Sequence, residues 1–130
     1  RVVSTFLQQA LAGEPLTVFG TGKQTRSFCY VDDLIRGIVD MLWSSQTGPI
    51  NLGNPRERTV LELATEIGRV TGVEVNLAYE ELPTDDPGRR RPDISKAVSL
   101  LNWEPRVELH DGLSRTAEWM RSRIEAERDT

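Results

Sequence analysis

Glycines and prolines divide this sequence into short apolar segments whose periodicity alternates between that of a helix and that of a strand. The predicted order is a helix at 2–12, strands at 16–19 and 27–31, a helix capped at 32 or 33, a strand at 49–54, a helix at 59–71, a strand at 73–79, and helices at 94–101 and from 109 onwards. This interleaving predicts a small mixed α/β fold. It contains too few consecutive β-α-β units for a complete doubly wound sheet.

Residues at the ends of the segments support these boundaries. Thr59 and Glu62 have the spacing of a capping box, in which each side chain satisfies an amide at the start of a helix. Gly13 and Gly72 stand where a left-handed residue commonly ends a helix, and Asp93 is placed to cap the helix at 94–101. The second helix carries an apolar stripe, composed of Leu34, Ile35, Ile38, Val39 and Leu42.

The composition bounds the class of protein. With 130 residues, of which 38% are hydrophobic and 28% charged, the chain has the size and content of one globular domain. A net charge of -4 argues against a nucleic-acid partner, and the apolar runs fall short of the roughly 18 residues of a membrane span. One cysteine and one histidine exclude an internal disulfide and a cysteine- or histidine-based metal site, and favour a reducing cytoplasm. The sequence opens on RVVSTF without methionine, so we expect a longer parent protein.

Several catalytic and phosphate-binding motifs are missing from the sequence. No GxGxxG segment follows a predicted strand, and GTGKQT at 20–25 lacks the GK[ST] ending of a P-loop. His110 is expected in a surface or capping position, and Cys29 is expected to be a small core residue within an apolar strand. Nothing in the sequence therefore predicts a nucleophilic triad.

The polar groups that remain stand in predicted loops. Arg26 precedes a strand, Phe19 ends another, and GRRRPD at 88–93 puts three arginines side by side. A guanidinium donates two parallel hydrogen bonds to a phosphate, and an aromatic ring stacks on a base. The same residues also fit a solvated Arg26, a core Phe19 and an arginine run balanced by Asp85 and Asp86.

The order of these segments resembles one enzyme family. PLTVFG followed by QTRSFCYVDDL is shared in outline by many nucleotide-sugar enzymes, and NLGNP with DDPGRRRPDI resembles the UDP-glucuronic acid decarboxylases more particularly. The resemblance covers essentially all of residues 1–130. The decarboxylases that the chain resembles are members of the extended short-chain dehydrogenase/reductase family. The resemblance implies the C-terminal substrate-binding domain of a longer enzyme, whose NAD-binding Rossmann domain and Tyr-x-x-x-Lys pair are absent from this chain. Neither Tyr30 nor Tyr79 has a lysine four residues later.

The resemblance also implies which residues meet the substrate. Thr17 and Phe19 fall where the family lines a uracil pocket, although many decarboxylases have tyrosine at the second position. Arg26 and Arg90 fall where arginines face the diphosphate, and Arg26 is also implicated near the substrate carboxylate. Two further residues complete the implied set: Gln24 for a sugar contact and Arg1 beside the nucleotide. Arg89 and Arg91 are expected to be solvated, and no catalytic, cofactor-binding or metal-binding residue is expected apart from an assisting role for Arg26.

The implied reaction is the NAD-dependent conversion of UDP-glucuronate to UDP-xylose and CO₂, with this chain inactive alone. The implied partners are a UDP-sugar, the missing Rossmann half and a second copy in a homodimer. Neither nucleic acid nor a membrane is expected, and the missing half would leave an apolar surface exposed. Two alternatives stay open: the same part of a nucleotide-sugar 4,6-dehydratase or epimerase, and a non-catalytic nucleotide-sugar-binding or interaction module.

Overall fold

The computed structural model describes residues 2–86, 88 and 90–129, which form five helices and four short strands. The helices are α1 (Val2–Leu11), α2 (Val31–Leu42), α3 (Val60–Thr71), α4 (Ser95–Leu101) and α5 (Leu109–Arg128), and the strands are β1 (Leu16–Phe19), β2 (Thr25–Ser27), β3 (Glu57–Thr59) and β4 (Leu77–Glu80). The five predicted helices and the mixed α/β class are confirmed, whereas of the four predicted strands only the one at 16–19 has the predicted bounds.

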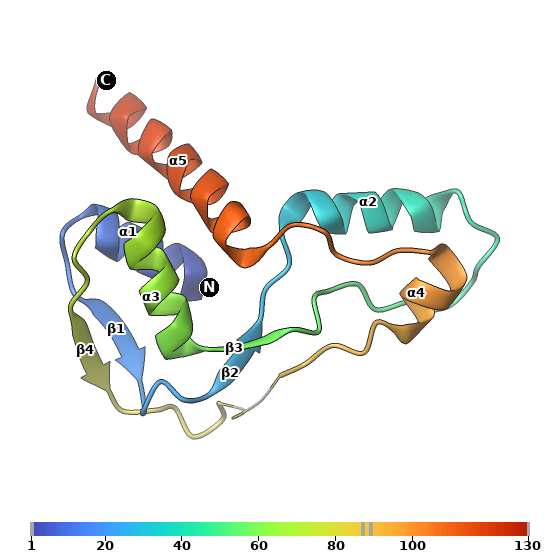
Figure 1. The fold of residues 1–130 in the computed structure, drawn as a ribbon, viewed down its shortest axis with the longest axis horizontal. Coiled ribbons are helices and arrows are strands. Elements are labelled where there is room, and N and C mark those ends of the chain that lie inside the picture. Colours follow the sequence, from blue (N-terminus) through green and yellow to red (C-terminus); the bar gives the residue numbers. More distant parts are fainter. Residues whose placement is uncertain (1, 87, 89, 130) are drawn as a thin grey trace.

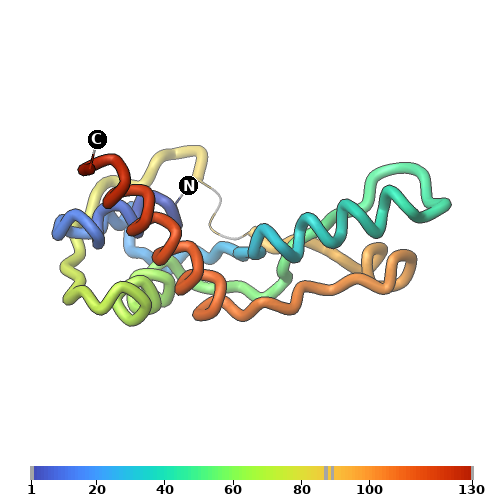
Figure 2. Tube along the Cα trace, turned by 90° about the horizontal axis from the view of Figure 1, so that it is seen from above, coloured from blue at the N-terminus to red at the C-terminus, as the bar shows by residue number. Residues whose placement is uncertain are grey.

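The strands pair in two separate ribbons. β1 and β4 run parallel with Leu16 opposite Leu77, and β2 and β3 run antiparallel with Arg26 opposite Arg58. Figure 1 shows an elongated molecule with α1, α3, β1 and β4 at one end and α2 and α4 at the other. Figure 2 shows the same separation from above. The β2–β3 ribbon lies between the two ends.

Helices α1, α3 and α5 pack together into the main core. Phe6 and Leu7 of α1 and Leu63 and Ile67 of α3 are fully buried there. Burying a side chain of this size stabilises a fold by about 1.5–3 kcal/mol relative to leaving it in water. The core therefore fixes α1 and α3 as a firm support for β1, which packs against them.

The predicted ends of α3 are confirmed. The Glu62 amide donates to Thr59 Oγ1 and the Thr59 amide donates to Glu62 Oε1, each at 3.0 Å. Gly72 ends the helix in the left-handed region at φ 72°. Ile94, in place of the predicted Asp93, is the N-cap residue of α4, which begins one residue later than predicted; Asp93 Oδ1 accepts the Ser95 amide at 2.9 Å.

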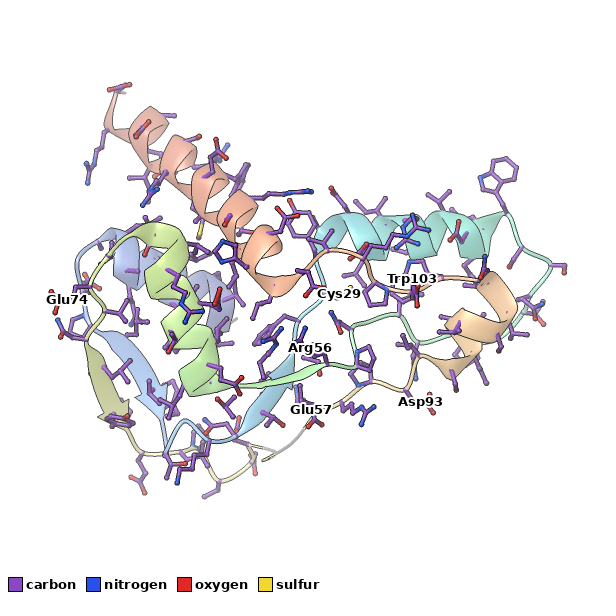
Figure 3. The ribbon with its side chains drawn as sticks, in the orientation of Figure 1. Cys29, Arg56, Glu57, Glu74, Asp93 and Trp103 are labelled. Carbon is purple, nitrogen blue, oxygen red and sulfur yellow. The ribbon has the colours of Figure 1, made fainter. Side chains whose placement is uncertain are left out.

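Trp103 centres the packing at the other end of the molecule, where it lies near α2 and α4 (Figure 3). Its side chain is fully buried and its indole Nε1 donates to the Asp33 carbonyl at 2.9 Å. Gly37 faces the same ring, because a Cβ there would come within 3.0 Å of the indole nitrogen. The apolar stripe of α2 points largely outward: Ile35, Ile38, Val39 and Leu42 are exposed, and Leu34 is half-buried.

The predicted strand at 27–31 is wrong. β2 ends at Ser27 because β3 offers only three partner residues. Beyond it, Phe28 packs against the main core and the Tyr30 carbonyl accepts amides from the first turn of α2. Tyr30 is the N-cap residue of α2, in place of the predicted Asp32 or Asp33.

Two further strand predictions are corrected. Residues 49–54 form no strand, and Leu52 instead packs so close to Gly37 that a Cβ there would lie 2.8 Å from it. The strand predicted at 73–79 starts four residues later and ends one residue later, at Leu77–Glu80, because its parallel partner β1 has four residues. Both segments have the apolar pattern of a strand. Whether each one forms a strand, and over how many residues, depends on the partner strand available for hydrogen bonding.

Candidate functional site

A cleft of about 940 Å³ lies between α1, β1, β2 and the segment that follows β4. Its lining is mainly apolar, with Phe6, Phe28 and Leu52 among the contributors. Polar side chains converge on it from separate elements, and they include Thr17, Gln24, Arg26, Asn54, Asp86 and Arg90. A mainly apolar hollow with a few convergent polar groups is typical of a small-molecule site.

The turn between β1 and β2 is held against the start of α3. The Leu61 amide donates to the Gly22 carbonyl and the Val60 amide donates to the Gln24 carbonyl, each at 3.1 Å. Gly22 has φ 75°, and a Cβ there would lie 2.7 Å from Leu61 and 2.9 Å from Val18. Glycine alone fits both the backbone conformation and the space. The first amides of α3 are therefore used to fix this turn.

Side-chain amides make the hydrogen bonds at three of the predicted substrate-binding residues. Gln9 Nε2 donates to Thr17 Oγ1 at 2.8 Å, and the Thr17 amide donates to Gln9 Oε1 at 3.0 Å. Gln24 Nε2 donates to the Phe19 carbonyl at 2.8 Å. The Phe19 residue is 45% exposed, so the alternative of a core Phe19 is wrong. Thr17 and Phe19 thus present a hydroxyl and an aromatic ring from one strand.

Arg26 is bound by a carboxylate of the chain itself. Its Nη2 lies 2.7 Å from both Oδ1 and Oδ2 of Asp86, and its Nη1 donates to the Thr25 carbonyl at 2.6 Å. The two side chains are 18% and 25% exposed, so the alternative of a solvated Arg26 is wrong. Asp86 therefore pairs with Arg26 inside β2, whereas one alternative drawn from the sequence had Asp86 balancing the arginine run.

The segment that follows β4 forms one wall of the cleft, and we call residues 81–86, 88 and 90–93 the strap. Figure 1 shows it running past β2 on its way to α4. Ser27 Oγ donates to the Arg90 carbonyl at 3.3 Å. Pro92 packs against Gly53, where a Cβ would come within 3.0 Å of its ring. The strap thereby brings charged side chains from far along the sequence to β2.

The structure brings five of the six predicted substrate-binding residues to the cleft, namely Thr17, Phe19, Gln24, Arg26 and Arg90. Arg1 and Arg89 lie outside the described residues. Arg91 is exposed as expected and also lines the cleft. Asn54 and Asp86 line it as well and were missed as site residues, although both stand in the NLGNP and DDPGRRRP segments that carry the resemblance.

The cysteine and the histidine supply no nucleophilic pair. Cys29 is half-buried in the cleft lining, so the prediction of a core position is corrected. Burial, together with the negative charge of Asp33, raises the pKa of the thiol to about 11, which keeps it protonated and unreactive at neutral pH. His110 is exposed, as predicted, and its Nδ1 lies 3.0 Å from Glu66 Oε2.

The glycine turn after β1 does not have the arrangement of a dinucleotide-binding turn. Gly20 and Gly22 follow β1 but lead into β2, whereas a dinucleotide-binding turn opens a helix whose amides hold the pyrophosphate. Across the part of the chain that the structure describes, no group of three histidine, cysteine or acidic side chains is arranged to hold a metal ion. In the same residues, no helix combines the length and the apolar character that crossing a membrane requires.

Comparison of the sequence with known proteins gives a consistent result. Residues 1–53 match the model of the NAD dependent epimerase/dehydratase family. UDP-glucuronic acid decarboxylase 6 of Arabidopsis thaliana is 49% identical over 124 residues, which cover 95% of this chain and 36% of that protein. The chain thus spans about a third of the length of the curated relatives that it matches.

Solved structures share the fold. UDP-glucuronic acid 4-epimerase of Bacillus cereus in complex with UDP-glucuronic acid and NAD matches with a TM-score of 0.87 at 31% identity, over 94% of this chain and 40% of that one. UDP-glucose 4-epimerase of Thermotoga maritima with UDP-glucose matches with a TM-score of 0.90 at 31% identity, over 95% of this chain and 40% of that one. Sequence and fold agree: residues 1–53 match the NAD dependent epimerase/dehydratase family, and nearly the whole chain is similar to UDP-glucuronic acid decarboxylases.

Proposed function

We propose that this chain is the nucleotide-sugar-binding portion of an NAD-dependent UDP-glucuronate decarboxylase, which forms UDP-xylose and CO₂. The observation that carries the proposal is the convergence of Arg26, Arg90 and the exposed ring of Phe19 on one cleft. The similarity of nearly the whole chain to part of the UDP-glucuronic acid decarboxylases supports it, as do related folds solved with UDP-sugars.

The cleft offers matching groups for the uracil and for the diphosphate of a UDP-sugar. The exposed ring of Phe19 supplies a face for stacking the uracil, and the Thr17 hydroxyl, which accepts from Gln9, keeps its own proton to donate to a uracil carbonyl. Arg26 and Arg90 supply charge-assisted hydrogen bonds to the diphosphate. Binding of these remote groups positions the sugar for reaction, because it restricts the sugar before the chemical step.

The chemical step itself belongs to residues outside this chain. We propose that the longer protein supplies the NAD site and the Tyr-x-x-x-Lys pair, and that it works as a cytoplasmic homodimer, in keeping with the single cysteine. On its own, this chain binds the substrate and does not convert it. Arg26 assists by holding an anionic group of the substrate in place.

A second candidate is the same portion of a nucleotide-sugar 4-epimerase. It is favoured by the two solved epimerases whose folds match nearly the whole chain. The two candidates differ in the product that a longer protein carrying this sequence would form from UDP-glucuronate. A decarboxylase releases one CO₂ for each sugar consumed, whereas a 4-epimerase releases none.

Titration calorimetry of this chain with UDP and with NAD⁺ tests the proposal. We expect UDP to bind, and Arg26→Ala and Arg90→Ala each to weaken binding by about tenfold or more, because a hydrogen bond to a charged group is lost. Arg128→Ala is the matched control, since it removes the same charge from an exposed site at the end of α5. Equal binding of UDP to the wild type and to both cleft variants would overturn the proposal. NAD⁺ binding as tight as that of UDP would contradict the division of roles.

A further inference from the structure

The pair formed by Arg26 and Asp86 lies inside the proposed anion site. Both side chains line the cleft, and one guanidinium nitrogen contacts both carboxylate oxygens at 2.7 Å. A carboxylate and a phosphate present similar oxygen acceptors to a guanidinium. The Asp86 carboxylate therefore makes the same kind of contact with Arg26 that an anionic ligand would make.

Ligand and carboxylate cannot share this arginine without an electrostatic cost. Two negative charges about 4 Å apart repel each other, and they do so more strongly near a protein surface than in bulk water. An anion that approaches Arg26 therefore favours departure of Asp86 from the guanidinium. The cost of departure is moderate, because the Asp86 side chain is already 25% exposed and gains water when it turns outward.

The position of Asp86 on the strap allows this movement. Its amide closes a local turn by donating to the Pro83 carbonyl at 3.1 Å, whereas the neighbouring attachments of the strap to β2 are made by the carbonyls of Gly88 and Arg90. The Asp86 carboxylate can thus leave Arg26 by rotation of its side chain while these backbone contacts stay in place.

We propose that Asp86 is a specificity-determining residue that competes with the ligand for Arg26 and is displaced by a diphosphate. The inference rests on the proposed function. It adds that the cleft selects among anionic ligands by their negative charge. A diphosphate carries enough negative charge to replace the carboxylate, whereas a weak anion such as acetate does not. Asp86 thereby lowers the affinity of the cleft for every anion and excludes the weakly bound ones.

Pyrophosphate binding to variants of this chain provides the test, because pyrophosphate lacks the base and the sugar. We expect Asp86→Asn to bind pyrophosphate about three- to tenfold more tightly than the wild type, as loss of a partly exposed ion pair predicts. Asp85→Asn is the matched control, since Asp85 is exposed, adjacent and outside the cleft lining. It should change the affinity by less than about twofold, because solvent screens its charge.

A second pair of measurements shows whether the effect passes through Arg26. In an Arg26→Gln background, Asp86→Asn should tighten pyrophosphate binding no more than Asp85→Asn does. In the wild type, the NMR signal of the Asp86 carboxyl carbon should shift when pyrophosphate is added, and it should not shift with acetate. This signal needs no substitution at Asp86, so it decides the question even where Asp86→Asn disturbs folding.

The outcomes separate this inference from the proposed function. If the wild type binds UDP but Asp86→Asn binds pyrophosphate no more tightly, or more weakly, then Asp86 positions Arg26 and the competition is refuted. If pyrophosphate binds and displaces Asp86 while UDP binds no better than pyrophosphate, the competition stands and the nucleotide-binding function fails. Absence of binding by either ligand overturns both.

Discussion

The carboxylate of Asp33 ties the start of α2 to the segment that leads into α5. Its Oδ2 accepts the amides of Arg106 and Val107 at 3.0 and 2.9 Å, and Arg36 Nη2 donates to its Oδ1 at 3.1 Å. The residue is 3% exposed. Burial alone would raise the pKa of this carboxyl, but the two amides and Arg36 outweigh burial, so its pKa lies below the ordinary value.

Replacement of this carboxylate should destabilise the fold in a pH-dependent manner. We expect Asp33→Asn to lower the free energy of unfolding at pH 7 by about 2 kcal/mol, because hydrogen bonds to a buried charge are lost. The folded pKa is lowered, so the stabilisation is fully present above the unfolded value of about 3.9 and disappears as the pH falls through the lower folded value. Urea unfolding at pH 7 and near pH 2 measures both effects. Exposed Asp32 is the control, and Asp32→Asn should cost less than about 1 kcal/mol.

The two tryptophans at the α2–α4 end should respond very differently to the same substitution. Trp103 is fully buried and hydrogen-bonded, so Trp103→Ala should cost about 3–5 kcal/mol of unfolding free energy. Trp43 is 87% exposed, and Trp43→Ala should stay within about 0.5 kcal/mol of the wild type. Thermal unfolding followed by circular dichroism compares them. Similar losses for both variants would contradict this arrangement.

Substitution of Gly22 should damage the cleft as well as the fold. Gly22 and Gly13 both have φ 75°, but a Cβ at Gly13 would meet nothing within 4 Å. Gly13→Ala should therefore cost about 1–2 kcal/mol from the backbone alone, and Gly22→Ala about 1–3 kcal/mol more from the clash with Leu61 and Val18. We expect Gly22→Ala, but not Gly13→Ala, to weaken UDP binding in calorimetry at a temperature where both variants are folded. Undiminished UDP affinity in Gly22→Ala would show that the turn does not position Arg26.

The role proposed for Phe19 predicts a loss that depends on the ligand. Phe19→Ala should weaken UDP binding by about tenfold, as expected for lost stacking on one base, and leave pyrophosphate binding unchanged. Tyr79→Ala serves as the control, because Tyr79 is an exposed aromatic residue on the neighbouring strand and lies outside the cleft lining. An equal loss for both ligands would show that Phe19 supports the cleft and does not stack on the base.

Much of the candidate site could be predicted from the sequence, although its internal pairing could not. The motif positions pointed to Thr17, Phe19, Gln24, Arg26 and Arg90, which the structure gathers around one cleft. Asp86 was named only in the alternative in which Asp85 and Asp86 balance the arginine run, and Asn54 was not considered. Both reach the cleft through folding of distant segments, and Asp86 stands 60 residues from Arg26 in the sequence.

The sequence by itself determined the order of the helices and the ends of α3, because a capping box and a left-handed glycine act through contacts within a few residues. It could not determine the strand lengths, since β2 and β4 extend only as far as β3 and β1 pair with them. Nor could it reveal that the apolar stripe of α2 faces outward, or that Asp86 holds Arg26. Only the tertiary structure decided these points, because each depends on which distant segment supplies the hydrogen-bonding, apolar or charged partner.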